Sequence, residues 1–555
     1  MKKMPVHKYK PYPAVDLPDR RWPSGAITVA PRWCSVDLRD GNQALVMPMT
    51  TDEKRDMFNL LVSMGFKEIE VGFPSASQAE YDFMRRLIEE DLIPEDVIIQ
   101  VLTQAREHLI KKSFDALIGC KRAIVHLYTS TSELQRRVVF GMGRREIIAL
   151  AVRGAEWIRA EAERMVGTDI LYQYSPESFT GTEQDFALEI CEAVMDVWQP
   201  SAEKKVILNI PATVEMSTPN VYADRVEWFC RRIKDRDKVV VSVHAHNDRG
   251  TAVAATELAL LAGADRIEGT LFGNGERTGN VDIITVALNM LSQGIDPKLD
   301  FSDIDGIAGV YERCTRIPVH VRHPYAGELV YTAFSGSHQD AINKGMNALK
   351  NKSDFWEVPY LPIDPSDVGR TYESIIRINS QSGKGGVAYL IEREWGIRLP
   401  KEMHPEFGRI IQGLSDSTGQ EVTPIMIWNA FDNEYLRAET PYSLGKSRTN
   451  QNGGDEVQIH AVICVRGSDR EINGRGNGPI DAFSNALHEH LGIGFRLLSY
   501  HEHAIEKGSA SRAAAYIQIK VTGGKSFWGA GIDTSIDRAS FKAILSALNR
   551  SEACF

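Results

Sequence analysis

The 555-residue sequence predicts an α/β fold built on a (β/α)8 (TIM) barrel, followed by helical linker subdomains and a C-terminal α+β domain. Three observations predict it. Short β-rich runs alternate with longer amphipathic helical stretches, without interruption, between residues 35 and 293. Polar side chains gather at or just beyond the carboxyl ends of the predicted strands. Beyond residue 293 the alternation stops, and the end of the chain contains an internal near-repeat.

Each predicted strand of the barrel is followed by one predicted helix. The strands are expected at residues 35–40, 67–73, 97–103, 122–129, 169–175, 205–211, 238–244 and 266–272. The helices are expected at residues 52–64, 77–90, 105–118, 144–164, 183–198, 218–236, 250–262 and 281–292. The rival architecture is an open doubly wound sheet, but the glycine-rich fingerprint that follows the first strand of such sheets is absent. The series therefore favours a closed parallel barrel.

Beyond the barrel, the pattern predicts helical linker subdomains that cap the barrel mouth. They contain a proline-rich piece at 358–365 and polar motifs at 335–340 and 379–386. The next boundary is expected near 440–455, where the stretch 449–456 is turn-rich and polar. We expect an N-terminal arm at 1–30, the barrel at 31–300, the linker subdomains at 301–440 and a C-terminal domain at 441–555.

The C-terminal domain shows two copies of one pattern. Strand-like residues 457–465 lead to a glycine turn at 474–482 and a helix, and strand-like residues 515–521 lead to a glycine turn at 527–535 and a helix. Glycines before a helix let backbone N–H groups approach an anion such as a carboxylate, although they can also serve only as tight turns. The repetition, without catalytic residue types, favours a pseudo-symmetric sensor of a small ligand.

Composition excludes several classes of protein. A net charge of −10, spread evenly, gives no support for nucleic acid or an anionic membrane as the main partner. The seven cysteines show no Cys-x-x-Cys spacing, which indicates a reducing, cytoplasmic compartment rather than a disulfide framework or a zinc ribbon. No apolar run approaches the ~20 residues of a membrane span. The segment 1–23 lacks the hydrophobic core of a signal peptide.

One pair of histidines is the main candidate for a metal site. His244 and His246 end the β-branched run 238–243, and side chains two residues apart on a strand face the same side. Asp40, at the end of the first predicted strand, would add a carboxylate. Two imidazoles and one carboxylate with open positions suit a divalent metal that also grips a substrate. The alternative is a pair of solvated loop histidines.

Such an ion could chelate a 2-oxo acid through its keto and carboxylate oxygens. Arg39 could then meet the oxygen that becomes an alkoxide, or could instead form a salt bridge that closes the barrel. Asn280 could add a neutral oxygen ligand. Other polar side chains expected near the mouth are His126, Ser175, Glu177, Thr213 and Glu276.

Three motifs carry a resemblance to a known family. Residues 37–43 (DLRDGNQ), 244–248 (HAHND) and 273–280 (GNGERTGN) resemble the signature of the acyl-CoA Claisen condensation family. The similarity to its long bacterial members runs essentially from end to end. It includes residues 174–179, 211–215, 335–340, 360–364 and 476–479.

The resemblance implies an acyltransferase that joins acetyl-CoA to 3-methyl-2-oxobutanoate and hydrolyses the thioester, which releases CoA and 2-isopropylmalate in the committed step of leucine synthesis. It implies a divalent metal, with Mg most favoured and Mn or Zn also suitable. It implies a homodimer in which the cap comes from the partner subunit. The C-terminal domain would then be regulatory and bind leucine as a feedback inhibitor.

The resemblance also implies roles for individual residues. Metal ligands would be Asp40, His244, His246 and Asn280. Substrate-binding residues would be Arg39, His126, Ser175, Glu177 and Thr213. Catalytic residues would be Arg39, Glu177, Glu276, His338 and Tyr360, of which His338 and Tyr360 deprotonate the acetyl methyl group or activate water. Leucine-binding residues would be Gly476, Asn477, Gly478, Pro479 and Tyr500.

Two other functions stay open from sequence. A sister enzyme of the same family could act on pyruvate or 2-oxoglutarate, because one methylene in a pocket changes discrimination by only about 1–3 kcal/mol. A catalytically inactive leucine-binding regulator is the more remote alternative.

Overall fold

The computed structural model divides into two compact units, residues Met1–Tyr331 with Ile363–Tyr372, and residues Thr332–Pro362 with Glu373–Phe555. The structure describes residues 12–333, 335–349, 355–371, 387–388, 391–392, 395–418, 422, 424–451, 456–505, 511–521 and 524–552. The predicted motif at 379–386 lies outside the described residues. The domain boundaries given above remain predictions.

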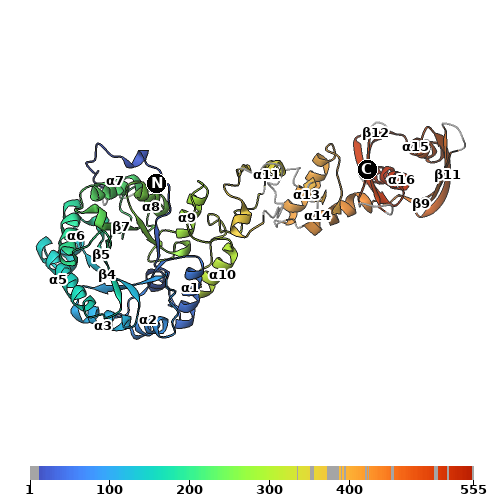
Figure 1. Ribbon diagram of the computed structural model, residues 1–555. Coiled ribbons are helices and arrows are strands. Elements are labelled where there is room, and N and C mark those ends of the chain that lie inside the picture. Colours follow the sequence, from blue (N-terminus) through green and yellow to red (C-terminus); the bar gives the residue numbers. More distant parts are fainter. Residues whose placement is uncertain are drawn as a thin grey trace. The chain divides into compact units, whose positions relative to one another are not determined.

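The first unit is built on a closed barrel of eight parallel strands in sequence order, which confirms the predicted fold class (Figure 1). The strands are β1 (Arg32–Ser35), β2 (Glu68–Gly72), β3 (Ile98–Gln104), β4 (Arg122–Ser130), β5 (Asp169–Glu177), β6 (Val206–Asn209), β7 (Val239–His244) and β8 (Arg266–Gly269). The barrel closes where β1 pairs with β8, with Cys34 opposite Glu268.

Helices surround the barrel on the outside (Figure 1). They are α1 (Thr51–Ser63), α2 (Gln78–Glu89), α3 (Glu107–Leu117), α5 (Arg144–Ala162), α6 (Gln184–Trp198), α7 (Pro219–Cys230), α8 (Ala252–Leu261) and α9 (Ile283–Leu291). A capping box at Thr50 and Glu53 starts α1. The predicted helix 218–236 is too long. The chain after α7 makes a turn, with Asp235 at φ 49°, before a short 3-10 helix leads into β7.

The first predicted strand is placed wrongly. Residues 35–40 were expected to be extended, but β1 ends at Ser35 and Asp37–Gly41 form a π-helical turn. The Asp37 carboxylate accepts hydrogen bonds from the Ser35 hydroxyl at 2.8 Å and from the Leu271 backbone amide at 3.0 Å. These bonds tie the turn to the end of β8. Asp40 therefore lies on this turn, not at the end of a strand.

The N-terminal arm is attached to the outside of the barrel by charged groups of α7. Arg20 Nε and Trp22 Nε1 both donate to Asp224 Oδ1 at 2.8 Å, and the backbone amide of Arg21 donates to Glu227. After the barrel, α10 (Ile304–Thr315) leads to Arg316, which pairs with Glu53 of α1 at 2.6 Å.

The second unit contains helices and two antiparallel sheets. Its helices are α11 (Gly336–Leu349), α13 (His404–Thr418), α14 (Pro424–Phe431), α15 (Pro479–Leu491) and α16 (Ile536–Glu552). One sheet has the order β11-β10-β9 and the other β12-β13-β14. The strands are β9 (Tyr442–Gln451), β10 (Val457–Val465), β11 (Ser468–Gly476), β12 (Phe495–Ala504), β13 (Ala513–Val521) and β14 (Ser526–Asp533).

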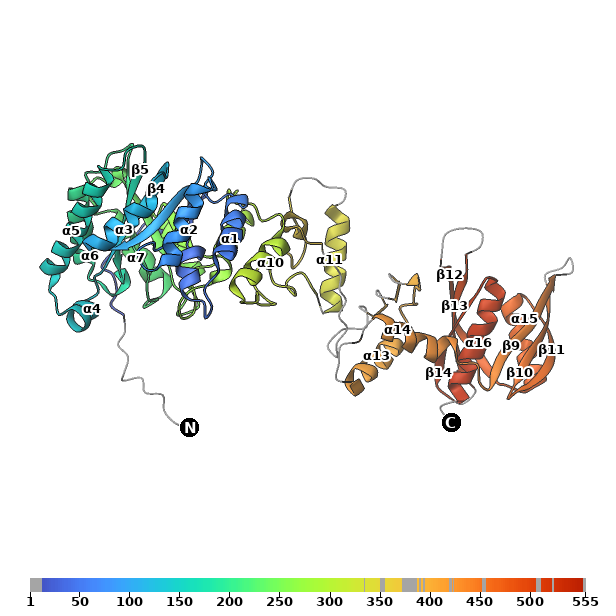
Figure 2. The same ribbon diagram turned by 90° about the horizontal axis from the view of Figure 1, so that it is seen from below.

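The two sheets enclose α15 and α16 (Figure 2), and buried residues of both sheets and both helices form one core. The opposite face of the second sheet packs through Tyr516 and Trp528 on α13, α14 and their described neighbours. The internal repeat is therefore real, since each copy has three strands and one helix. Only one of the two sheets carries a helical layer on its other face among the described residues.

The glycine turns expected at 474–482 and 527–535 are wrong. Gly474 and Gly476 lie in β11, and Gly529 and Gly531 lie in β14. A Cβ at Gly474 would lie 2.3 Å from the Ala482 carbonyl oxygen, and one at Gly529 would lie 2.1 Å from that of Ala543. Each glycine pair therefore lets a helix backbone approach a strand. Part of the turn-rich stretch 449–456 is extended, because β9 runs to Gln451.

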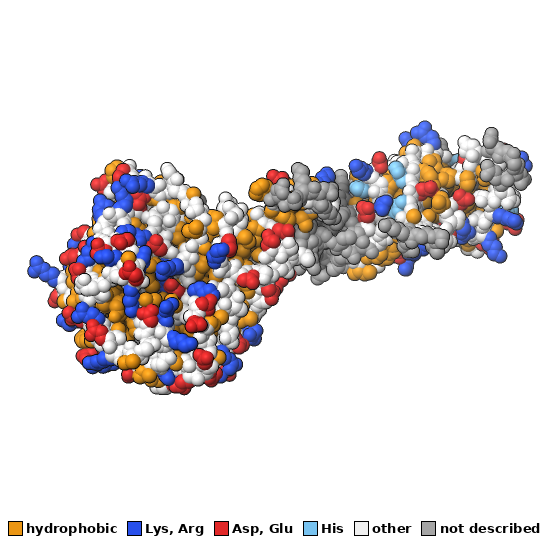
Figure 3. All heavy atoms as spheres, viewed as in Figure 1, with side chains coloured by type: hydrophobic (Ala, Val, Ile, Leu, Met, Phe, Trp, Pro, Cys, Tyr) orange, Lys and Arg blue, Asp and Glu red, His pale blue; other side chains and the backbone are white. Residues whose placement is uncertain are grey.

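The surface carries charges of both signs. On the face of the barrel unit seen in Figure 3, basic and acidic side chains are interspersed and neither sign forms a continuous patch. Among the helices of the described residues, none combines the length and apolar character needed to cross a membrane.

Candidate active site

A cavity of about 250 Å³ lies at the barrel mouth, and nine of the predicted site residues line it. The predicted residues that line it are Arg39, Asp40, His126, Ser175, Glu177, Thr213, His244, His246 and Glu276. They come from the segments that follow the strands, and from β4, β5 and β7 themselves. The cavity thus occupies the end of a (β/α)8 barrel where active sites are found.

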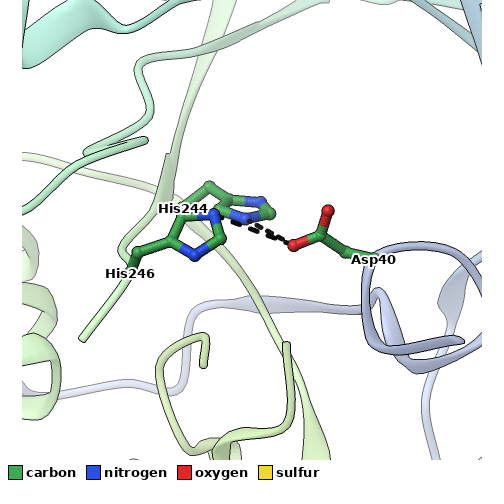
Figure 4. Close-up of side chains that lie close together, drawn as sticks. All are labelled: Asp40, His244 and His246. Carbon is green, nitrogen blue, oxygen red and sulfur yellow. Dashed lines mark ion pairs between the residues drawn. The ribbon is translucent and has the colours of Figure 1, made fainter. Parts of the chain in front are cut away.

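Asp40, His244 and His246 form the potential metal-binding group (Figure 4). The Nε2 atoms of His244 and His246 lie 3.5 and 3.8 Å from Oδ2 of Asp40, and all three side chains are buried. His244 ends β7, and His246 continues the extended chain by bridging to Asn280. The prediction that both imidazoles face one carboxylate is therefore matched by this geometry.

Neighbouring groups fix the charge of this trio. Burial alone would lower the pKa of His244, but the hydrogen bonds that its ring donates to Asp40 and Glu268 raise it to about 9. Burial and the neighbouring His244 lower the pKa of His246 to about 4. Burial opposes ionisation of Asp40, yet the Arg39 guanidinium and the two imidazoles hold its pKa well below its usual range. A cation bound here would compete with the proton on His244.

Asn280 is buried beside this trio rather than on the cavity wall. Its Nδ2 donates to Oδ2 of Asp40 and to the Asn274 carbonyl oxygen, each at 2.9 Å. Its Oδ1 is buried without a hydrogen-bond partner among the described residues. A buried acceptor without a partner is costly. Asp40, His244 and His246, with this amide oxygen as a neutral fourth ligand, therefore fit a divalent cation.

Arg39 is held in place by two carboxylates. Its Nε donates to Oε1 of Glu70 at 2.6 Å, and its Nη1 pairs with Asp40. The salt bridge considered from sequence exists, and the same side chain also lines the cavity. His126, inside β4, contacts Ser175 Oγ through Nε2 at 2.7 Å and Glu70 through Nδ1 at 3.3 Å. The Glu70 carboxylate therefore links Arg39 to His126.

Glu70, His126 and Glu268 also lie close enough together to hold a metal ion. The carboxylate of Glu70 already accepts hydrogen bonds from Arg39 and Gln100, and that of Glu268 accepts one from Arg266. This second trio is better described as a buried ionic network beneath the cavity than as a second metal site.

The structure adds cavity residues that the sequence reading missed. Tyr128, Asn209 and Arg277 line the cavity. Tyr128 follows His126 by two residues on β4, so the alternation that predicts one inward side chain also predicts the other. Arg277 donates to the Thr213 carbonyl oxygen at 2.6 Å and pairs with Asp248. Arg277 and Asp248 lie in motifs noted in the sequence, 273–280 and 244–248, which are the signal that could have identified them.

His338 and Tyr360 lie together in the second unit. Their rings stack with centroids 4.0 Å apart and an interplanar angle of 26°. His338 lies in the first turn of α11 and is exposed, and Tyr360, at φ 67°, is 62% exposed. An exposed imidazole stacked on an exposed phenol is available to a substrate.

The second unit also has a cavity of about 530 Å³ beside the start of α15. Asn477, Gly478 and Pro479 line it, and Gly478 is the N-cap of α15. Gly476 ends β11 next to them. Tyr500 lies elsewhere, packed against the core of the two sheets, where its hydroxyl accepts a hydrogen bond from Ser540 at 3.3 Å. The predicted leucine-binding residues are thus not all brought to one cavity.

Family models match nearly the whole chain. Residues 30–310 match HMGL-like, residues 328–392 match alpha-isopropylmalate synthase, post-catalytic domain-like, and residues 421–552 match the LeuA allosteric (dimerisation) domain. The barrel and its site thus define an HMGL-like protein with an allosteric domain of the dimerisation type.

Relatives identify the family within that class. The 2-isopropylmalate synthase of Rhodospirillum rubrum is 58% identical over 549 residues, 98% of either chain. That of Clostridium acetobutylicum is 58% identical over 557 residues, 99% of this chain and 100% of its own. The chain belongs to the 2-isopropylmalate synthase family. Among solved structures, the HMG-CoA lyase of Brucella melitensis aligns with 17% identity and a TM-score of 0.42, covering 52% of this chain and 100% of that one.

Proposed function

We propose that this chain condenses acetyl-CoA with 3-methyl-2-oxobutanoate and hydrolyses the thioester, which gives 2-isopropylmalate and CoA. The observation that carries the proposal is the buried group of Asp40, His244 and His246 on the wall of the barrel cavity, with Arg39 beside it. Relatives that bear the synthase name over the full chain support it.

Mg²⁺ is the ion we propose for this group, and Mn²⁺ or Zn²⁺ would suit the same donors. His244 and His246 would offer Nε2, Asp40 a carboxylate oxygen, and Asn280 its unpartnered Oδ1. When bound, a divalent cation polarises the keto group of a 2-oxo acid and makes its carbonyl carbon electrophilic.

The side chains around the cavity would orient the oxo acid. Arg39, fixed by Glu70, would face the keto oxygen as it gains negative charge. His126 and Ser175, hydrogen-bonded to each other, and Thr213 would contact the carboxylate and branched end of the acid. Glu177, which accepts a hydrogen bond from Ser130, would lie beside them.

The new C–C bond needs a carbanion from the acetyl methyl group and later a water molecule. We propose that His338 and Tyr360 remove the methyl proton or activate the water, with Glu276 in the same network. The carbanion attacks the keto carbon, and the resulting alkoxide takes up a proton. Water then attacks the thioester carbonyl and CoA leaves as the thiol. A base on a separate subdomain would let the site close over acetyl-CoA.

We further propose that the protein is a homodimer whose cap residues serve the partner's barrel, and that leucine inhibits it through the C-terminal domain. The match of residues 421–552 to an allosteric (dimerisation) domain supports both. The cavity lined by Asn477, Gly478 and Pro479 is the leucine site we favour. A reducing cytoplasm fits the free cysteines that the structure describes, most of them buried.

The test is CoA release by the full-length protein with acetyl-CoA and, in turn, 3-methyl-2-oxobutanoate, pyruvate and 2-oxoglutarate. We expect the fastest turnover with 3-methyl-2-oxobutanoate, loss of activity with a chelator, recovery with Mg²⁺ and inhibition by leucine. Faster turnover with pyruvate or 2-oxoglutarate would instead establish a sister synthase. Leucine binding without CoA release in the presence of metal would establish a regulator.

A further inference from the structure

Glu268 is a fully buried carboxylate beneath the cavity that accepts hydrogen bonds from five strands of the barrel. Its donors are His244 Nδ1 at 3.0 Å, Arg266 Nη1 at 2.7 Å, Gln173 Nε2 at 2.6 Å, Gln100 Nε2 at 3.2 Å and Asn209 Nδ2 at 3.1 Å. With donors on all sides, this carboxylate has one orientation and remains ionised.

The contact with His244 fixes which ring nitrogen carries the proton. A carboxylate only accepts, so Nδ1 of His244 must donate to Glu268. Neutral imidazole then has its lone pair on Nε2, the atom that faces Asp40 at 3.5 Å. His246 has no equivalent support, since its Nδ1 is buried without a partner among the described residues.

The charges beneath the cavity also do not balance. With His244 neutral, as a metal ligand must be, two guanidiniums that each pair with two carboxylates leave two negative charges in the barrel interior. The carboxylates are Asp40, Glu68, Glu70 and Glu268, and the guanidiniums belong to Arg39 and Arg266. Uncompensated buried charge is costly, and a divalent cation would neutralise this excess.

We propose that Glu268 is the positioning residue of the metal site: it orients His244 through Nδ1 and supplies part of the negative charge that attracts the cation. Arg266 in turn holds Glu268, with no side-chain exposure of either residue. This inference rests on the proposed function, because it assumes that Asp40, His244 and His246 hold a cation. A carboxylate behind a ligating histidine raises metal affinity by about 10–100-fold.

The experiment is a titration of full-length Glu268→Gln with Mn²⁺, followed by the EPR signal of free Mn²⁺. We expect the Kd for Mn²⁺ to rise about 10–100-fold over wild type. We also expect kcat to recover most of its wild-type value at saturating Mn²⁺, because the residue acts on the ion's position and not on the substrate. Circular dichroism establishes that the variant is folded.

The matched control is Glu68→Gln. Glu68 is also buried and also pairs with Arg266, at 2.5 Å, and the substitution removes the same charge without touching His244. We expect its Kd for Mn²⁺ to change by less than about threefold. Equal weakening in Glu68→Gln and Glu268→Gln would overturn the positioning role and leave only a charge effect.

If Glu268→Gln does not fold, Glu268→Asp keeps the charge and shortens the side chain. We expect it also to weaken Mn²⁺ binding, since the carboxylate no longer reaches Nδ1 of His244. Wild-type affinity in a folded Glu268 variant would overturn the inference alone. Failure of the wild-type protein to bind Mn²⁺ would overturn the proposed metal site and this inference with it.

Discussion

Asn280 donates a hydrogen bond from Nδ2 to Oδ2 of Asp40 at 2.9 Å, across 240 residues of sequence. Both imidazoles of the trio face this same oxygen. The Asn280 amide therefore holds the Asp40 carboxylate with Oδ2 toward both histidines. The Oδ1 atom of Asn280 has no hydrogen-bond partner among the described residues.

Replacing Asn280 by alanine should weaken metal binding. The change removes both the support of Asp40 and the proposed neutral ligand, so we expect the Kd for Mn²⁺ to rise at least about tenfold. Isothermal titration calorimetry measures it. Asn289→Ala is the control: Asn289 bonds to Glu257 and Tyr325, away from the site, and its loss should leave the affinity unchanged. Unchanged affinity in Asn280→Ala would remove Asn280 from the ligand set.

The stacked pair His338 and Tyr360 offers a test of site sharing between subunits. Asp40→Asn and His338→Ala should each be inactive as homodimers. If the cap serves the partner's barrel, mixing them and allowing exchange should restore about a quarter of wild-type CoA release, because half of the dimers are mixed and each has one intact site. Mixtures that stay inactive, with mixed dimers demonstrated by a tag on one variant, would show self-contained sites.

Asp37 should make the stability of the barrel depend on pH. Burial raises its pKa from 3.8 to about 7. The folded state thus binds this proton more tightly than the unfolded chain. The free energy of unfolding should fall as pH rises from about 4 to about 7, by up to about 4 kcal/mol, and stay constant above.

Hydrogen exchange of β1 and β8, corrected for intrinsic rates, measures this effect. Asp37→Asn should remove the pH dependence, because the amide cannot ionise. A variant whose protection against exchange still declines over the same pH interval would mean that another group is responsible.

The second cavity allows a test of inhibition that spares catalysis. A Cβ at Gly478 meets no atom within 4 Å, and the backbone there is extended at φ −169°. Gly478→Ala should therefore fold normally and place a methyl group in the proposed leucine site. We expect the leucine concentration for half inhibition to rise about tenfold or more, with kcat unchanged, since one well-placed clash costs ~1.4 kcal/mol.

Gly309→Ala, in α10, is the matched control, because its added methyl group also meets no atom within 4 Å. It should show wild-type inhibition. Normal leucine sensitivity in Gly478→Ala would place the effector elsewhere in the second unit.

Local sequence patterns predicted the barrel well because its strands are continuous buried runs and its helices are amphipathic. They failed at β1, where the bonds of Asp37 to Ser35 and Leu271 convert an extended pattern into a π-helical turn. They failed again at Gly474 and Gly529, which look like turn residues and instead serve close contact between strand and helix.

The proposed metal ligands could be placed at the cavity from sequence because they lie at or just beyond the strand ends in recognisable motifs. The buried residues that hold Arg39 and His244 in place, Glu70 and Glu268, could not be predicted from the sequence. Glu70 and Glu268 alternate with apolar neighbours in β2 and β8, as solvent-facing residues of a half-exposed strand do. Barrel closure turns these side chains toward the enclosed interior, where Glu70 pairs with Arg39 and Glu268 pairs with Arg266.

The most direct test of the central claim is a crystal structure of the full chain with Mn²⁺ and 3-methyl-2-oxobutanoate, with the ion located by anomalous scattering. We predict one Mn²⁺ peak bound by Asp40, His244 and His246, with the keto and carboxylate oxygens of the acid completing its coordination. An oxo acid bound in the barrel cavity with the ion absent from these three side chains would contradict the account.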